Sequence, residues 1–93
     1  MNKAKKKWHV SDNLQASQID EQNTIILDVN SGEFYSTGDI GGKIIQNLEK
    51  GNTIAQISEQ IADEYDITQD LALDDSLKFV GQLEEKGLVS VKE

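Results

Sequence analysis

The sequence predicts an α+β fold in which a three-stranded antiparallel sheet is followed by three α-helices. Two short apolar runs flank a turn at Asn30 to Gly32, which is the pattern of a β-hairpin, and a further strand-like segment precedes them at Leu14 to Asp20. Downstream of Gly38, apolar residues recur at helical spacing in three segments. This order of elements is typical of a winged helix-turn-helix-like module.

The hairpin covers Ile25 to Thr37. Its first strand is rich in β-branched residues, which fit a pleated, half-buried surface, and Asn30 and Gly32 tolerate the positive φ of tight turns. Side chains alternate along the second strand, so Phe34 and Ser36 share one face. The hairpin either is simply the sheet of a small domain or keeps a free edge on this second strand for a guest strand.

The first helix is predicted over Asp39 to Lys50, with Ser36, Thr37 or Asp39 as its cap. The pair Gly41-Gly42 lowers helix propensity near its start, and such a pair indicates a close approach to a neighbouring strand. The glycine spacing does not match a phosphate-binding loop.

The second helix is predicted over Ile54 to Glu64, because Thr53 and Gln56 have the spacing of a capping box. The third helix starts at Thr68 or Asp70 and runs to about Lys86. A short terminal strand, Leu88 to Val91, is expected to pack on the body.

We divide the chain into an N-terminal basic tail and lead-in, residues 1–13, and one domain, residues 14–91. Met1 to Lys7 is expected to be frayed, and Trp8 is expected to attach it to the body. No apolar h-region follows the lysines, so this is not a signal peptide, and no apolar run has the length of a membrane span. The chain has no cysteine, which fits a cytoplasmic location.

The net charge of −8 is unevenly distributed. Four of the nine lysines lie in the first seven residues, so the rest of the chain carries five lysines against seventeen acids, a net charge of −12. A field of this sign repels phosphate backbones, so we expect no nucleic-acid binding by the domain body.

We find no catalytic constellation and expect no enzyme, no cofactor and no metal. The adjacent carboxylate pairs, such as Asp74-Asp75, point in different directions on a helix and are read as solvated surface. The single histidine, His9, has no cysteine or second histidine near it, so a metal role is not expected.

An exposed strand edge beside an apolar helix face favours strand addition by a peptide, because main-chain hydrogen bonds supply affinity and side-chain pockets supply selectivity. Tyr35 is either sheet filling or a peptide contact. Leu77 and Val80 are either core residues or the floor of a groove between the third helix and the edge strand.

An ordered set of short segments resembles the PqqD-like family, the peptide-recognition elements of pathways that modify ribosomally made peptides (RiPP recognition elements). The match covers about Leu14 to Val89, and the chain looks most similar to the stand-alone leader-binding proteins of split lasso-peptide systems. The segments are Ile26 to Ser36, Ile40 to Ile45, Thr53 to Ile57, Tyr65-Asp66, Asp75 with Phe79, Leu83, and Gly87 to Val89.

The resemblance implies a non-catalytic adaptor that binds the leader of a precursor peptide by strand addition. It also implies that the adaptor presents the leader to a transglutaminase-like leader peptidase, and the macrolactam-forming cyclase is a further implied partner. The implied alternatives are a PqqD-like chaperone for a radical-enzyme pathway and a winged-helix DNA-binding regulator. The implied peptide-binding residues are Glu33, Phe34, Tyr35, Ser36, Thr37, Leu73, Asp74, Leu77 and Val80.

Overall fold

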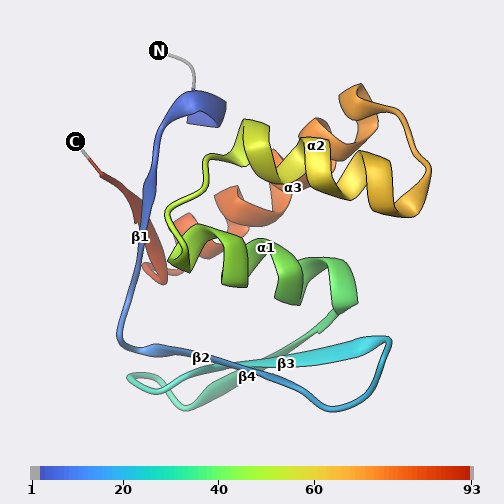
Figure 1. Cartoon of the computed structure of the whole chain (residues 1–93). Helices are drawn as coiled ribbons and strands as arrows, with labels where there is room; N and C mark the ends of the chain where they lie inside the picture. The colour runs from blue at the N-terminus through green and yellow to red at the C-terminus, as the bar shows by residue number, and fades with distance from the viewer. Residues whose placement is uncertain (1–2, 93) are drawn as a thin grey trace.

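The computed structural model describes residues 3–92 and has an α+β fold (Figure 1). A three-stranded antiparallel sheet precedes three helices, as predicted, and a second, two-stranded sheet joins the two ends of the chain. The elements are a 3-10 helix at Lys3–Lys5, β1 (Trp8–Val10), β2 (Leu14–Gln18), β3 (Asn23–Asp28), β4 (Glu33–Gly38), α1 (Asp39–Glu49), α2 (Ile54–Tyr65), α3 (Gln69–Glu85) and β5 (Val89–Val91).

The larger sheet has the order β2-β3-β4, so β2 and β4 are its two edges. The register runs without a bulge, from Leu14 opposite Asp28 to Gln18 opposite Thr24, and the first predicted strand is confirmed with an end at Gln18. The β3–β4 turn is held by the Asp28 carboxylate, which accepts hydrogen bonds from the main-chain N–H groups of Asn30 and Ser31. Gly32 adopts a φ of 78° in this turn, a conformation that glycine reaches without strain.

The N-terminal segment is more ordered than predicted. Met1 and Asn2 lie outside the described residues, but Lys3–Lys5 forms a 3-10 helix whose Ala4 is buried. Trp8 is buried, and β1 pairs antiparallel with β5, which brings Trp8 opposite Val91. The prediction of a frayed tail is therefore wrong from Lys3 onward, because a buried tryptophan and a partner strand hold this segment. The division of the chain at residue 13 stays a prediction.

The helix starts are partly as predicted. Thr53 caps α2 with the full capping box to Gln56, and Thr68 caps α3. The predicted cap of α1 is wrong: Gly38 occupies that position and no side chain bonds there. The reason is that β4 runs directly into α1, so the strand continues to the last residue before the helix.

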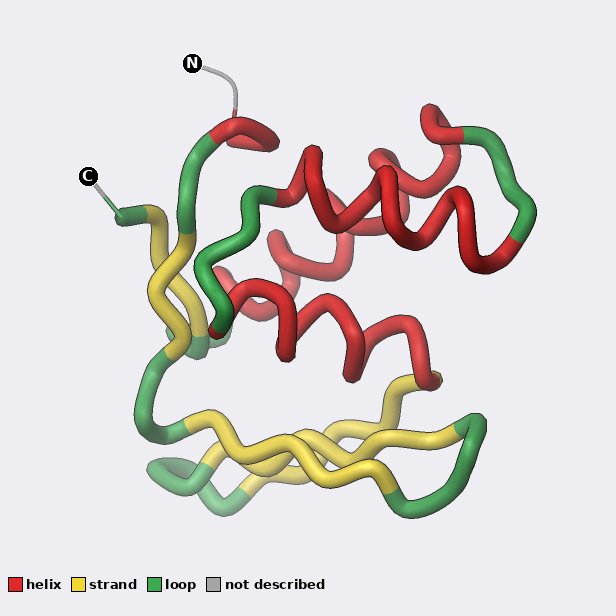
Figure 2. The backbone as a smooth tube through the Cα atoms, in the orientation of Figure 1, coloured by secondary structure: helices red, strands yellow, loops and turns green. Residues whose placement is uncertain are grey.

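The helices lie on one side of the three-stranded sheet, and α1 lies directly over it (Figure 2). Isoleucines of α1 and α2 and leucines of α1 and α3 join Trp8 and Ile26 in one core. Val80 of α3 belongs to this core and is fully buried. No helix among residues 3–92 combines the length and hydropathy needed to cross a membrane.

Candidate peptide-binding edge

The free edge of β4 presents the main-chain groups of alternate residues. Val29 donates its N–H to Asn13 O at 2.8 Å and Ile19 donates to Asn23 O at 3.0 Å, so the odd-numbered residues of β3 bond toward β2. Residues alternate between the two neighbours in an antiparallel ladder, so Thr24, Ile26 and Asp28 bond toward β4. By the same alternation, Phe34, Ser36 and Gly38 direct their main-chain groups to the open side of β4.

Side chains of β4 divide as the alternation predicts. Tyr35 and Thr37 are half-buried on the face covered by the helices, whereas Phe34 is 69% exposed on the other face. A strand added at this edge would therefore meet the main chain of Phe34 and Ser36, and the side chains of Tyr35 and Thr37 would lie beside its inward-facing residues.

One flank of α3 accompanies β4. The Lys86 Nζ atom lies 4.6 Å from the centre of the Tyr35 ring, and Phe79 and Asp75 lie beside Thr37 at the other end of the strand. Positions 75, 79 and 86 fall on one side of a helix with 3.6 residues per turn. We refer to the strip between this flank and β4, from Tyr35 to Thr37, as the groove.

At its α1 end the groove deepens into a mainly apolar pocket of about 210 Å³. Gly41 forms part of the wall, and a Cβ atom there would lie 2.3 Å from Thr37 Oγ1 and 3.0 Å from Phe79 Cζ. The absence of a side chain at Gly41 thus lets α1 approach β4 and keeps the pocket open. The pocket is lined by Thr37, Gly38, Asp39, Ile40, Gly41, Ile44, Asp75 and Phe79.

A polar network holds the start of α1 at the edge of this pocket. The Tyr65 hydroxyl donates to the Asp39 carboxylate, and Lys43 bonds to Glu64 and lies 4.9 Å from the centre of the Tyr65 ring. Burial and the bond to Asp39 raise the pKa of Tyr65, and the bond to Glu64 raises the pKa of Lys43. Tyr65 of α2 thus fixes the position of Asp39, whose carboxylate accepts its hydrogen bond.

A second local bond orients the edge strand itself. The Tyr35 hydroxyl donates to Glu33 Oε2 at 3.0 Å. Burial of the ring, followed by this bond and the charge of Glu33, raises the pKa of the Tyr35 hydroxyl. Glu33 thus holds the ring of Tyr35 against Lys86, at the end of the groove opposite the pocket.

The α3 residues predicted to contact a peptide lie away from the flank that faces β4, and their role in binding stays a prediction. Leu77 is two residues from Phe79 and points to nearly the opposite side of the helix, and Leu73 and Asp74 lie on that far side too. Asp74 instead pairs with Lys78 at 3.0 Å on the surface. Val80 has no exposed surface and belongs to the core.

The residues on the flank that faces β4 are Asp75 and Phe79 of α3 and Lys86, which directly follows α3, and the peptide-contact prediction did not include them. Their signal was present in the sequence as the i, i+4 pair Asp75 and Phe79. Residues 3–92 contain no group of three or more His, Cys, Asp or Glu side chains that could hold a metal ion.

Comparison with known proteins agrees with this geometry. The family model of coenzyme PQQ synthesis protein D (PqqD) matches residues 23–89. A solved structure described as lasso peptide synthetase B1 complexed with the leader peptide superposes with a TM-score of 0.78 at 25% identity, covering 90% of this chain and 98% of that one. TbiB1 in complex with the TbiA(beta) leader peptide gives 0.76 at 25% identity, covering 87% and 93%. No curated protein matches the chain.

Proposed function

The chain belongs to the PqqD family, and from this premise we propose that it is a non-catalytic adaptor that binds the leader of a precursor peptide in lasso-peptide biosynthesis. The observation that carries the proposal is the open edge of β4 beside the α3 flank, in a fold that superposes on two leader-bound proteins. We place this activity in the cytoplasm, which suits a chain without cysteine.

The leader adds to β4 as an antiparallel strand. It exchanges main-chain hydrogen bonds with Phe34 and Ser36, and one of its apolar side chains enters the pocket beside Phe79. The exposed carboxylate of Asp75 at the pocket favours a basic residue next to that apolar one. We expect a Kd in the sub-micromolar range, about −8 to −10 kcal/mol.

Bound leader is presented to a transglutaminase-like leader peptidase, with the macrolactam-forming cyclase as a further partner. Holding the leader and the enzyme together raises the local substrate concentration, which is the physical advantage of an adaptor without chemistry of its own. The family description supports a second candidate, a chaperone for a peptide in a radical-enzyme or quinone-cofactor pathway. The genes beside this one distinguish the two.

The test is a fluorescence-anisotropy titration with a labelled leader taken from the short open reading frame beside this gene. Ser36→Pro removes an outward N–H and puts a ring where the leader lies, while leaving the β3 ladder intact, so we expect Kd to rise at least ten-fold. Ala16→Pro is the matched control, because it makes the same change on the opposite edge, β2.

Saturable binding by the wild type that Ser36→Pro weakens and Ala16→Pro leaves within two-fold supports the proposal. Absence of binding at tens of micromolar, with circular dichroism showing a folded protein, contradicts it. A gel shift at low salt then tests the DNA-binding alternative, which the net charge of −12 over residues 8–93 disfavours.

A further inference from the structure

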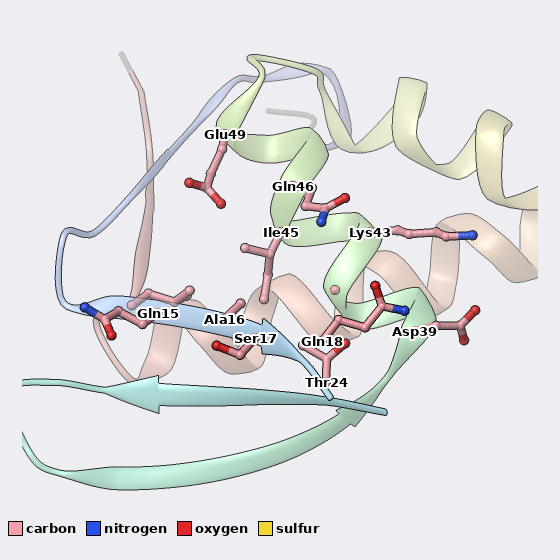
Figure 3. Close-up of a pocket in the computed structure, with 12 residues that line it drawn as sticks. Gln15, Ala16, Ser17, Gln18, Thr24, Asp39, Lys43, Ile45, Gln46 and Glu49 are labelled. Carbon is pink, nitrogen blue, oxygen red and sulfur yellow. The ribbon is translucent and has the colours of Figure 1, made fainter. Parts of the chain in front are cut away.

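A second groove lies beside the opposite edge of the sheet, between β2 and α1 (Figure 3). It encloses about 530 Å³, more than twice the volume of the pocket at β4, and falls in the size range of ligand sites. Its lining is mostly polar, whereas the pocket at β4 is mainly apolar. The proposed leader site does not use it.

The edge strand of this groove has open main-chain groups. The ladder that directs Gln15 and Ser17 toward β3 leaves Ala16 and Gln18 directed to the open side. Natural edge strands are usually protected from pairing by charges, proline or bulges. β2 reads Leu-Gln-Ala-Ser-Gln and has none of these.

A buried hydroxyl in the groove has no partner. Thr24 is 2% exposed, lines the groove, and its Oγ1 atom bonds to nothing in residues 3–92. Gly42 makes room for it, since a Cβ there would lie 2.7 Å from that oxygen. Buried polar groups normally have hydrogen-bond partners, so this hydroxyl points to an occupant with a polar side chain.

The charges at the groove define that occupant further. Lys43 bonds to Glu64 and Asp39 accepts from Tyr65, and Figure 3 shows both head groups directed away from β2. Glu49 also lines the groove, and its carboxylate has no ion pair within residues 3–92. The fitting ligand is an extended strand whose side chains are polar and neutral except for one basic residue that pairs with Glu49.

A second copy of this chain fits poorly. Two β2 strands paired antiparallel about Ala16 would put Leu14 of the copy beside Gln18, the neighbour of Thr24, and would leave the hydroxyl without a partner. Both copies also carry a net charge of −8.

We propose that the groove between β2 and α1 is a second strand-addition site, which takes an extended polar segment of the leader peptidase while the leader occupies β4. This rests on the proposed function. Because β2 and β4 are opposite edges of one sheet, the two strands do not compete, and the sheet joins substrate and enzyme side by side.

Amide hydrogen exchange on the ¹⁵N-labelled chain tests the proposal directly. Adding the leader should protect the Phe34 and Ser36 amides, and adding the peptidase encoded beside this gene should protect Ala16 and Gln18. Peptidase binding without protection on β2, or no peptidase binding by the wild type, overturns the proposal.

Variants give a second, quantitative test by biolayer interferometry with immobilised peptidase. Ala16→Pro and Glu49→Lys should each weaken peptidase binding at least ten-fold and leave leader affinity within two-fold. Glu59→Lys is the control, because it makes the same charge change at an exposed residue of α2 that does not line the groove. Glu49 is exposed, so its variant keeps the test valid if Ala16→Pro unfolds.

Unchanged peptidase binding by Glu49→Lys and folded Ala16→Pro refutes the second site. If these variants instead weaken leader binding, the groove is the leader site and the peptidase site is refuted. Failure of the proposed function gives a different result, because the wild type then binds no leader at β4 in the anisotropy titration.

Discussion

Replacing Gly41 by alanine tests the close contact between α1 and β4. The new methyl would lie 2.3 Å from Thr37 Oγ1, 2.8 Å from Thr37 Cγ2 and 3.0 Å from Phe79 Cζ. Attractive contacts between non-bonded heavy atoms lie near 3.5 Å, so Thr37 must retreat by about 1 Å or α1 must lift from the sheet. The substitution therefore strains the junction between strand and helix.

The magnitude follows from two opposing effects. Overpacking a core contact costs about 1–3 kcal/mol, while replacing glycine inside a helix gains about 0.5–1 kcal/mol. We expect a net loss of about 1–2 kcal/mol in the free energy of unfolding. For a domain of this size that lowers Tm by about 4–16 °C.

Thermal melts by circular dichroism measure the effect, and Gly81→Ala is the control. Gly81 lies within α3, and a Cβ there would meet nothing within 4 Å, so this variant should melt higher than the wild type. The Gly41→Ala methyl should also occupy the pocket and weaken leader binding. Equal stabilisation by both alanines would refute the steric reasoning.

Three further predictions concern the groove wall, a buried hydroxyl and the Tyr65 network. Leu77→Asp should lower stability yet leave leader affinity within two-fold, whereas Phe79→Ala should weaken binding in the anisotropy titration; the reverse order would place the groove on the other flank of α3. Thr24→Val removes an unpaired buried hydroxyl and should raise the free energy of unfolding by about 1 kcal/mol in urea titrations, whereas a loss would reveal a partner for it. Burial and the bond to Asp39 raise the pKa of Tyr65, so its contribution to stability is present below about pH 10 and is lost as pH rises through its folded-state pKa. Between about pH 9 and 11.5, Tyr65→Phe should therefore lose less free energy of unfolding than the wild type. Parallel curves of stability against pH would contradict this.

Local signals in the sequence predicted most of the fold. The hairpin turn, the Thr53–Gln56 capping box and the apolar spacing of the helices each depend on neighbouring residues, and the structure confirms them. The pairing of β1 with β5 joins residues about 80 positions apart, and no pattern of neighbouring residues predicts a contact over that distance. Trp8 was the one available sign that this segment is held to the body.

The edge strand was predictable for the same local reason, but the helix flank was not. A helix with apolar residues at positions 73, 77, 80 and 83 shows which residues avoid water without showing which neighbour each one meets. Leu77 and Phe79 have similar character in the sequence, and only the packing of α3 against β4 separates them. The spacing of Asp75 and Phe79 shows which flank of α3 faces the strand only when the position of β4 is known.

The pairing of β1 with β5 has a consequence for engineering. Lys92 donates its N–H to Lys7 O at 2.9 Å, so the chain enters and leaves the fold at neighbouring points, on a sheet separate from β2 and β4 (Figure 1). A fluorescent protein, an affinity handle or a whole enzyme attached at either terminus would begin from this same place. The architecture suits a cassette that can be joined to or inserted between other domains while both edges of its larger sheet stay accessible.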